Sequence, residues 1–462
     1  MTSNQRVVVI GGGLAGLRLA ARLTGGATVT VLGEEPHVPY NRVLLAEVLA
    51  GRYAPEVTAL PAPGPALRRG VRAVRIDRAD RTVRCDDGTV AEYDTLVLAT
   101  GSNAVLPPLR GLFEPEGRDL PDGVHAFRTM DDCLALSAAV RPGARAVVIG
   151  GGLLGVSAAR ALAARGAVVV LAQQGERLME RQLDTEASAL LAAHLTSLGV
   201  EIHTECRVRG LATTGVSPAA PLPGLRPGPR ASNAGGAEFQ RRPADGTSQD
   251  PASPAFEARG RGGRAPGGGA APGQRRVTGV ELADGYRLEA DLVVLACGVR
   301  PRTGLAQAAG LETRRGIVVD DHLRTSDPRI HAIGDCAEHA GQVYGLAGPA
   351  LEQADALAAV LTGTPAPYTG TRALTRLTLG GAENGSLDLA AFGETTPRPG
   401  DDVVRLADAT RRTYRKVVVR DDRLVGGVLL GELSTVGALA RTWEGGESPH
   451  DLFHLLTDDG GH

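Results

Sequence analysis

Two glycine motifs contain the residues of this sequence whose type and spacing could do chemistry. Both have the spacing G-x-G-x-x-G. Their glycines are Gly11, Gly13 and Gly16 in the first motif and Gly150, Gly152 and Gly155 in the second. In such a motif the first glycine makes a tight turn, the second lets a pyrophosphate approach the backbone, and the third lets the following helix pack against the strand. Each motif therefore predicts a site for the pyrophosphate of a dinucleotide.

The surroundings of the two motifs support this interpretation. Each follows an apolar run typical of a buried strand, "VVVI" in the first case and "AVVI" in the second. Each also precedes a stretch rich in alanine and leucine that predicts a helix. The eighteen residues that begin at Arg6 are identical at eleven positions to those that begin at Arg145. The repeat predicts that the chain binds two dinucleotides, or one dinucleotide twice.

A polar residue ends the second strand expected in each repeat. The strand in "ATVTVLGEE" ends at Glu34, where a carboxylate can accept hydrogen bonds from both ribose hydroxyls. In the second repeat the strand in "AVVVLAQQGER" ends at Gln173. An amide can bond a ribose hydroxyl but does not repel a 2′-phosphate, and Arg177 lies nearby. We therefore expect the second site to accept both NADH and NADPH.

Three further strands complete the expected architecture. "YDTLVLATG", "ADLVVLACG" and "RIHAIGDCAEH" are apolar runs that lead into glycine turns and could close the sheets begun earlier. We predict an α/β chain with two Rossmann-like dinucleotide-binding domains, the first discontinuous, and a small C-terminal α+β domain. The expected bounds are 1–121 and 290–364 for the first domain, 122–289 for the second and 365–462 for the third.

Two regions depart from this pattern. Residues 212–276 are rich in proline, glycine, alanine, serine and arginine and lack apolar periodicity, so we expect a disordered insertion in a loop. After residue 364, the stretches "ALTRLTLG", "SLDLAAFG", "RTYRKVVVR" and "RLVGGVLLG" predict short strands, and "TVGALARTW" predicts a helix. These elements would form the C-terminal domain.

The composition disfavours several other classes of protein. A length of 462 residues implies two or three domains, and a net charge of -2 argues against nucleic-acid binding. No apolar run approaches the roughly 18–20 residues that span a bilayer, so we expect a cytoplasmic protein without membrane contact. The five cysteines include no CxxC pair, which disfavours a disulfide framework and a metal site. They are Cys85, Cys133, Cys206, Cys297 and Cys336.

With these features the chain resembles the two-dinucleotide-binding flavoprotein reductases of the pyridine nucleotide-disulfide oxidoreductase superfamily. The resemblance implies that the first domain binds FAD and the second binds NAD(P)H. It assigns the first glycine motif and Glu34 to the ADP half of FAD, and "ATG" and "IGDC" to the flavin side and the ribityl chain. The residues of these two segments are Ala99, Thr100, Gly101, Gly334 and Asp335. A helix in "GPALEQADALAAVL" would direct its positive N-terminus at the flavin.

Longer stretches make the resemblance more specific. "EEPHVPYNRVLLAEVLAG", "GERLMERQLD" and "GIVVDDHLRTSDPRIHAIGDCAEH" are similar to the flavoprotein part of NAD(P)H-dependent nitrite reductases and their stand-alone relatives, among them the electron-transfer subunits of assimilatory nitrate reductases. "YRKVVVRDDRLVGGVLLGE" is similar to the small domain of NADH:rubredoxin reductases. Arg42 falls where these relatives place a basic residue beside the flavin.

Three departures from these relatives narrow the expected function. The sequence has no cysteine-rich half for a sirohaem and an iron–sulfur cluster, so we do not expect it to reduce nitrite alone. The stretch "PYNRVLLAEVLAGRY" has no redox cysteine where thiol-based members carry one. Glu47 and Ser157 stand where many relatives pair a lysine with a glutamate.

The resemblance implies an FAD-dependent NAD(P)H:acceptor oxidoreductase that passes electrons through FAD to a separate redox protein. No side chain need act as a catalytic acid or base in this reaction. The first expected acceptor is an assimilatory nitrite or nitrate reductase. The alternatives are a reductase of rubredoxin or ferredoxin, and a flavoprotein that regulates a binding partner without fast turnover. The chain could also form a homodimer.

Overall fold

The computed structural model describes residues 5–61, 66–114, 117, 119–214, 275–364, 367–380, 386–408 and 410–445. Most of the expected disordered insertion, 212–276, lies outside these residues. Its first residues do not, because strand β13 (Val208–Thr213) continues past residue 212 and pairs with β14 (Val277–Leu282). Within the described ranges, no helix has the length and apolar character needed to cross a lipid bilayer.

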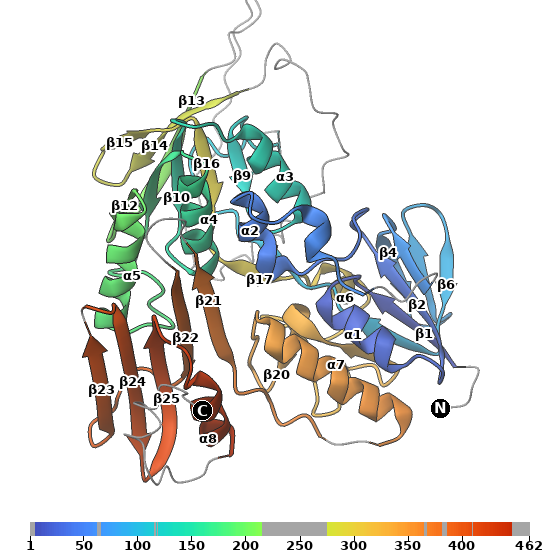
Figure 1. Ribbon diagram of the computed structural model, residues 1–462. Helices are drawn as coiled ribbons and strands as arrows, with labels where there is room; N and C mark the ends of the chain where they lie inside the picture. Colours follow the sequence, from blue (N-terminus) through green and yellow to red (C-terminus); the bar gives the residue numbers. More distant parts are fainter. Residues whose placement is uncertain are drawn as a thin grey trace, which may run out of the picture. The chain divides into compact units, whose positions relative to one another are not determined.

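Five parallel strands form the first sheet, in the order β3-β2-β1-β7-β19; β1 and β2 are labelled in Figure 1. The strands are β1 (Arg6–Ile10), β2 (Thr28–Gly33), β3 (Leu67–Arg69), β7 (Thr95–Leu98) and β19 (Ile330–Ala332). The central strands are apolar runs, as expected for a parallel sheet that is buried on both faces. Helix α1 (Leu14–Arg22) packs beside α7 (Ala347–Thr362). Across that contact Arg18 and Arg22 form ion pairs with Asp355.

A second sheet of five parallel strands repeats this order as β12-β11-β10-β16-β9. Its strands are β9 (Val124–Ala126), β10 (Arg145–Ile149), β11 (Val168–Ala172), β12 (Val200–His203) and β16 (Leu292–Leu295). Its helices are α3 (Met130–Ala139), α4 (Leu153–Ala164) and α5 (Thr185–Ser197). In both sheets the strand before the glycine motif is central. The strands that follow it are added first on one side of it and then on the other, so the strand order reverses at this point. Such a point is where open α/β sheets bind ligands.

The repetition extends beyond the parallel strands. A three-stranded antiparallel sheet precedes the fourth strand of each copy. These strands are β4 (Ala73–Asp77), β5 (Thr82–Cys85) and β6 (Val90–Glu92) in the first copy, and β13, β14 and β15 (Arg287–Glu289) in the second. An arginine at the start of each central strand, Arg6 or Arg145, donates through its backbone and its guanidinium to one aspartate, Asp94 or Asp291. The insertion falls where the first copy has only the short turn between β4 and β5.

Shorter elements lie between the strands of the two parallel sheets. They are the 3-10 turns η1 (Arg42–Leu44), η2 (Pro55–Thr58) and η4 (Gly334–Cys336), the helices α2 (Leu45–Leu49) and α6 (Gly304–Ala308), and the strands β8 (Ser102–Ala104), β17 (Val299–Pro301), β18 (Ile317–Val319) and β20 (Ala337–His339). Strands β18 and β20 pair in parallel, and β8 and β17 pair antiparallel. Since β8 follows the fourth strand of the first sheet and β17 follows the fourth strand of the second, the β8–β17 pair joins the two copies.

Five antiparallel strands form the C-terminal sheet, in the order β21-β22-β25-β24-β23. They are β21 (Leu374–Leu379), β22 (Leu387–Gly393), β23 (Asp402–Asp408), β24 (Thr413–Arg420) and β25 (Arg423–Leu430). Helix α8 (Val436–Gly445) packs on β25. Strand β23 is not among the strands expected from the sequence. It is an edge strand with no fully buried residue, in which the half-buried Val404 and Leu406 alternate with exposed residues.

The single lysine of the chain links the C-terminal sheet to α5. Lys416 of β24 donates to Asp184 Oδ2 at 2.7 Å and to the carbonyl oxygen of Thr395 at 3.0 Å. Tyr414 donates to the same carboxylate oxygen at 2.7 Å, and the N–H of Ala187 donates to Asp184 Oδ1 at 3.0 Å. Burial favours the neutral acid, but these donors outweigh it and lower the pKa of Asp184.

One hydrophobic core takes residues from distant parts of the chain. Leu45 and Leu49 of α2 pack with buried residues of α3, α4 and the second sheet, and with Leu379 and Leu430 of the C-terminal sheet. Helix α2 therefore shares the core of the second sheet, although its residue numbers lie within the expected range 1–121. Strand β16 pairs with β10, so the boundary expected at residue 290 falls before a strand of the second sheet.

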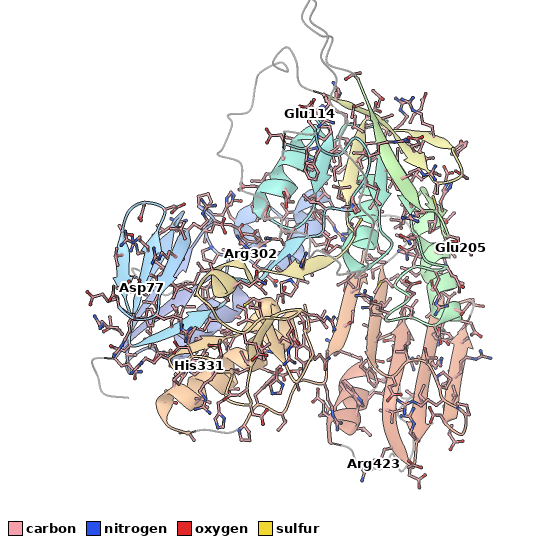
Figure 2. The ribbon with its side chains drawn as sticks, turned by 180° about the vertical axis from the view of Figure 1, so that it is seen from behind. Asp77, Glu114, Glu205, Arg302, His331 and Arg423 are labelled. Carbon is pink, nitrogen blue, oxygen red and sulfur yellow. The ribbon has the colours of Figure 1, made fainter. Side chains whose placement is uncertain are left out.

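A buried histidine makes the stability of the first sheet depend on pH. His331 of β19, labelled in Figure 2, is 4% exposed, and its Nδ1 atom has no hydrogen-bond partner among the described residues. Burial lowers the pKa of this imidazole to about 4 from 6.5. Between pH 6.5 and pH 4, His331 is protonated in the unfolded chain but stays neutral in the folded chain. The free energy of unfolding is therefore unaffected by the protonation of His331 above pH 6.5. It decreases as the pH falls toward 4, by up to about 3 kcal/mol.

We expect His331→Leu to flatten the decline in the free energy of unfolding between pH 6.5 and pH 4, because the variant has no such group to protonate. Urea unfolding at a series of pH values measures this slope. His322→Leu is the control, since His322 is a neighbouring histidine that is not fully buried. A slope equal to that of the parent protein in the His331→Leu variant would contradict the assignment.

Candidate dinucleotide-binding site

The first glycine motif lies at the carboxyl end of β1 and leads into α1. Gly11 has a positive φ of +127°, and a Cβ there would overlap the carbonyl oxygen of Ala99. A Cβ on Gly16 would overlap the carbonyl oxygen of Gly11, so its absence lets the helix lie directly on the strand end. A Cβ on Gly13 would meet no described atom within 4 Å. Gly13, the residue before α1, therefore faces open space.

The second motif has the same geometry at β10 and α4. Gly150 has a φ of +111°, and a Cβ there would overlap the carbonyl oxygen of Ala296. A Cβ on Gly155 would overlap the carbonyl oxygen of Gly150, and Gly152 again faces open space. Both motifs use the first and third glycines for packing and leave the second open to a ligand. Because the first N–H groups of a helix lack intrahelical acceptors, each open space fits a pyrophosphate.

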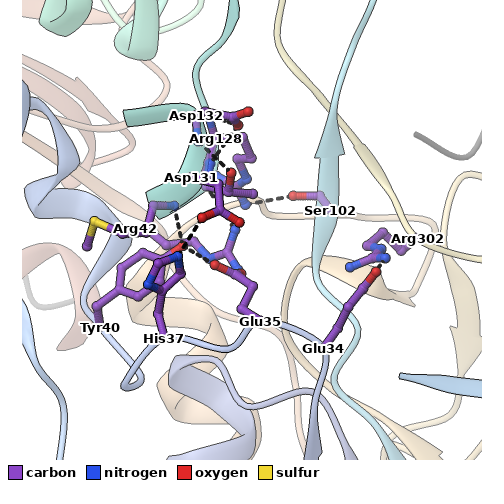
Figure 3. A network of polar contacts seen from close by, with 12 residues as sticks. Glu34, Glu35, His37, Tyr40, Arg42, Ser102, Arg128, Asp131, Asp132 and Arg302 are labelled. Carbon is purple, nitrogen blue, oxygen red and sulfur yellow. Dashed lines mark hydrogen bonds and ion pairs between the residues drawn. The ribbon is translucent and has the colours of Figure 1, made fainter. Parts of the chain in front are cut away.

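The residue directly after the second strand of each copy has a polar partner. Glu34 follows β2, and its Oε2 lies 2.6 Å from the guanidinium of Arg302 (Figure 3). Gln173 follows β11, and its amide oxygen accepts a hydrogen bond from the N–H of Gly151 at 2.8 Å. Gln173 thus points back at its own glycine motif. Glu34 is held by an arginine that the sequence patterns do not single out.

The "ATG" segment connects β7 to β8 in a fixed conformation. The N–H of Ala99 donates to the carbonyl oxygen of Ile10 at 2.8 Å, which continues the ladder of the first sheet. The hydroxyl of Thr100 donates to the carbonyl oxygen of Arg302 at 2.9 Å. Gly101 has a φ of +72°, and the N–H of Arg302 donates to its carbonyl oxygen at 2.9 Å. These bonds place the "ATG" turn against the strand that ends the second copy, β17.

Asp335 forms an ion pair with Arg128, which the sequence patterns also miss. Arg128 Nη2 donates to Asp335 Oδ2 at 2.6 Å and to Ser102 Oγ at 2.7 Å, and Ser102 donates to the same carboxylate oxygen at 2.9 Å. Gly334, with a φ of +75°, donates its N–H to the buried Gln353 at 2.7 Å. Burial lowers the pKa of Arg128, although Asp335 opposes the shift. Its buried Nε has no partner among the described residues, so it fits an anionic group.

Arg42 lies beside Arg128 in the same network (Figure 3). Its guanidinium pairs with Glu35 and donates to the carbonyl oxygen of Arg128 at 3.2 Å. Tyr40 donates to the other oxygen of Glu35 at 2.6 Å and accepts from the N–H of Met130 at 2.8 Å. Burial lowers the pKa of Arg42, but Glu35, Tyr40 and Asp335 together outweigh it and the net shift is upward. The segment that carries Arg42 is therefore fastened to the start of α3.

The structure brings together most of the residues that the sequence assigns to FAD, whereas Gln173 and the second motif lie in the other copy. The arginines that complete the site come from segments outside the quoted motifs. A signal for Arg128 exists in "RTMDD", because Thr129 and Asp132 form a capping box at α3. A capping box fixes the start of a helix, and so the position of the residue before it.

Comparison with known proteins identifies the family. Residues 5–220 and 267–354 match the family model of the pyridine nucleotide-disulphide oxidoreductases. The chain belongs to the pyridine nucleotide-disulphide oxidoreductase family. It is therefore an oxidoreductase, and members of this family use FAD and NAD(P)H. Residues 385–444 match the C-terminal domain of rubredoxin NAD+ reductases.

Several curated reductases are similar to this chain. An NAD(P)H nitrite reductase of Bacillus subtilis is 31% identical over 93% of this chain and 46% of its own length. The assimilatory nitrate reductase electron transfer subunit of the same organism is 30% identical over 93% of this chain and 48% of its own length. Rhodocoxin reductase of Rhodococcus erythropolis is 32% identical over 78% and 73%. The chain thus spans about half the length of the two Bacillus relatives.

Solved structures of reductases share the mixed α/β fold. A ferredoxin reductase from Rhodopseudomonas palustris superposes with a TM-score of 0.73 over 97% of both chains, at 26% identity. NADH:rubredoxin oxidoreductase from Clostridium acetobutylicum superposes with a TM-score of 0.66 over 99% of this chain and 100% of its own, at 18% identity. The α/β class expected from the sequence is therefore confirmed.

The cysteines differ from what a disulphide-dependent member of the family would need. Burial raises the pKa of all five thiols, to about 11 for Cys133 and Cys297. Because the thiolate is the reactive form, thiols with raised pKa values react slowly at neutral pH. Cys336 follows Asp335, but it is fully buried and donates to the carbonyl oxygens of Leu98 and Ile333. The pKa values therefore give no support to a thiol relay.

Glu47 pairs with Arg160 rather than with Ser157. Its Oε1 lies 2.6 Å from the guanidinium of Arg160, whereas the hydroxyl of Ser157 donates to the carbonyl oxygen of Leu153 at 2.8 Å. Helices α2 and α4 therefore still carry an ion pair. Its charges are reversed, with the acid on α2 and the base on α4.

Gly13 and Gly152 allow each site to be blocked without disturbing the fold. We expect Gly13→Val to abolish retention of FAD, because the side chain would fill the space in front of α1. Gly152→Val should retain FAD and lose NAD(P)H binding. Flavin absorbance per chain after gel filtration and titration with NAD(P)H measure the two effects.

Gly16→Val is the contrasting control for this experiment. Its side chain would overlap the backbone of Gly11, so it should lower the melting temperature of the protein rather than act on the cofactor alone. A folded Gly13→Val protein that keeps one FAD per chain would show that the first motif is not the FAD site.

Proposed function

We propose that this chain is an FAD-dependent NAD(P)H:acceptor oxidoreductase, with FAD in the first copy of the repeat and NAD(P)H in the second. The observation that carries the proposal is the matched geometry of the two glycine motifs, each with an open second glycine before a helix. The carboxylate of Glu34 suits the ribose of FAD in the first copy. The two copies would then be Rossmann-like domains, joined by β8 and β17.

The residues of the chain would bind and orient both cofactors. The first motif and Glu34 would hold the ADP half of FAD, while Arg42, Arg128 and Asp335 would hold its middle and flavin parts. Held by these residues, FAD would supply the chemistry of hydride and electron transfer between NAD(P)H and an acceptor. The protein contributes phosphate binding, orientation and a fixed electrostatic environment, and no acid or base is assigned to the reaction.

We further propose an assimilatory nitrite or nitrate reductase as the electron acceptor. The similarity to two Bacillus proteins of nitrite and nitrate reduction supports this choice. A small iron–sulfur protein is the second candidate, because rhodocoxin reductase matches over 73% of its length and residues 385–444 match a domain of rubredoxin reductases. Rates of NAD(P)H oxidation with a purified nitrite reductase, a ferredoxin and a rubredoxin as acceptors separate the candidates. If NAD(P)H oxidation is slow with all three acceptors although every chain holds a flavin, the result favours a regulatory flavoprotein.

If reduced FAD passes electrons directly to the acceptor, the cysteines are dispensable. We expect replacement of all five by alanine or serine to leave NAD(P)H-dependent reduction of ferricyanide largely intact. Each buried thiol, such as Cys133 or Cys336, leaves a small cavity that costs on the order of 1 kcal/mol of stability, so thermal unfolding must be measured in parallel. A folded cysteine-free protein that takes up hydride but reduces no acceptor would reveal a thiol relay.

The second site should discriminate only modestly between NADH and NADPH. Arg177 Nε has no hydrogen-bond partner among the described residues, and the side chain is 33% exposed, so its guanidinium could meet a 2′-phosphate. The carboxylate of Glu180 lies beside the same loop, because a Cβ on Gly175 would overlap Glu180 Oε2. This negative charge would act against a 2′-phosphate and so oppose Arg177. We expect a preference below roughly a hundredfold, or about 3 kcal/mol. Gln173→Asp should shift the cofactor preference toward NADH, and Arg177→Ala should lower kcat/KM for NADPH. A preference above roughly a hundredfold in the parent protein would show that other contacts determine the choice between NADH and NADPH.

A further inference from the structure

A charged residue lies in the hydrophobic core that α2, α4 and the C-terminal sheet share. Arg160 of α4 is 2% exposed, and it is one of the largest fully buried side chains among the described residues. Burial lowers its pKa, and the carboxylate of Glu47 opposes the shift. A guanidinium in apolar surroundings is costly unless it is paired. Partners of its two Nη atoms offset this cost, while its buried Nε has no hydrogen-bond partner among the described residues.

Arg160 has one partner in α2 and one next to the C-terminal sheet. Its Nη2 donates to Glu47 Oε1 at 2.6 Å, and its Nη1 donates at 3.1 Å to the carbonyl oxygen of Gly380, the residue after β21. Arg52 pairs with the other carboxylate oxygen of Glu47. One side chain thus connects a helix of the second copy, a helix that follows the flavin-side residue Arg42, and the C-terminal sheet.

The elements that Arg160 connects have different tasks in the proposed function. Helix α4 begins beside Gly152, in front of the open space assigned to NAD(P)H. Helix α2 follows Arg42 through η1. The apolar contacts between these helices are non-directional and would tolerate small shifts. A planar guanidinium that bonds a carboxylate and a carbonyl oxygen fixes both a distance and an orientation.

We propose that Arg160 is a positioning residue that sets α4 against α2 and the C-terminal sheet, and through them sets the nicotinamide against the flavin. The kinetic part of this inference rests on the proposed function. Stability alone does not require the charges, because a buried ion pair can often be replaced by apolar residues without loss of stability. Variants that remove both charges can therefore separate positioning from stability.

The double variant Glu47→Leu/Arg160→Met makes this separation. We expect it to fold and retain FAD, with a melting temperature equal to or above that of the parent protein. Both buried charges are gone, and Arg52, which loses Glu47 as its partner, is 40% exposed and can be solvated. Flavin reduction in a single turnover at saturating NAD(P)H should slow by roughly tenfold to a hundredfold, the scale expected for a misplacement of about 1 Å. The concentration of NAD(P)H at half-saturation should change little, because the second glycine motif is intact. Reduction at the parental rate would overturn the proposal.

Arg165→Met is the matched control. Arg165 follows α4 and donates to the carbonyl oxygen of Leu49 at 3.2 Å and to Ser137 Oγ at 3.1 Å, so it also links α4 to α2 and α3. Its partners are neutral and it is not fully buried. We expect flavin reduction in this variant at the parental rate. A loss equal to that of the double variant would show that any weakened contact of α4 slows the reaction, and would refute a specific role for Arg160.

Hydrogen exchange gives a readout that does not depend on turnover. Amides of α2 and β21 should exchange faster in the double variant than in the parent protein or in Arg165→Met, whereas amides of β1 should not change. If the flavin of the parent protein is not reduced by NAD(P)H, the proposed function fails, and exchange alone then tests Arg160. Unchanged exchange in α2 and β21 would refute the positioning role.

Discussion

The absence of a side chain at two glycines of each motif is the constraint on which the rest of the structure depends. Because Gly16 and Gly155 have no Cβ, α1 and α4 can lie against the carbonyl oxygens of Gly11 and Gly150. That contact sets the distance from each helix to its central strand. The first glycine of each motif in turn touches the end of the fourth strand, so the helix start and two strand ends are fixed together. The open space at the second glycine is what this packing leaves for a ligand.

Because the two copies are joined where their fourth strands end, segments that follow strands of the second copy can complete the site in the first. The pairing of β8 with β17 brings the "ATG" turn of the first copy next to the end of the second. Arg302 follows β17 and pairs with Glu34, and Arg128 follows β9 and pairs with Asp335. Glu34 and Asp335, the two carboxylates of the proposed FAD site, are therefore held by arginines that follow strands outside the first sheet. The electrostatics of the proposed FAD site consequently depend on how the two copies are paired.

The local signals of the sequence predict the glycine motifs and the strands and helices around them, because turn geometry and apolar runs act over a few residues. The contacts of Arg128, Arg302 and Arg160 could not be predicted in the same way, since each pairs with a carboxylate far away in the sequence and arginine supplies nearly all the positive charge of the chain. The run that forms β16 predicts a strand, but its partner sheet is a property of the whole fold. Strand β23 has only a short apolar signal, interrupted by Arg405, because it is an edge strand with no fully buried residue.

The two parallel sheets differ in how their cores are closed. The core of the first sheet takes its residues from the two stretches 7–98 and 306–368. The core of the second sheet includes residues from 40–49 and from 379–430 as well as its own. Burial of one leucine such as Leu49 or Leu379 contributes on the order of 2 kcal/mol, so loss of the C-terminal strands would destabilise the second sheet directly. The C-terminal sheet is therefore coupled by packing to the proposed nicotinamide side rather than to the core of the first sheet.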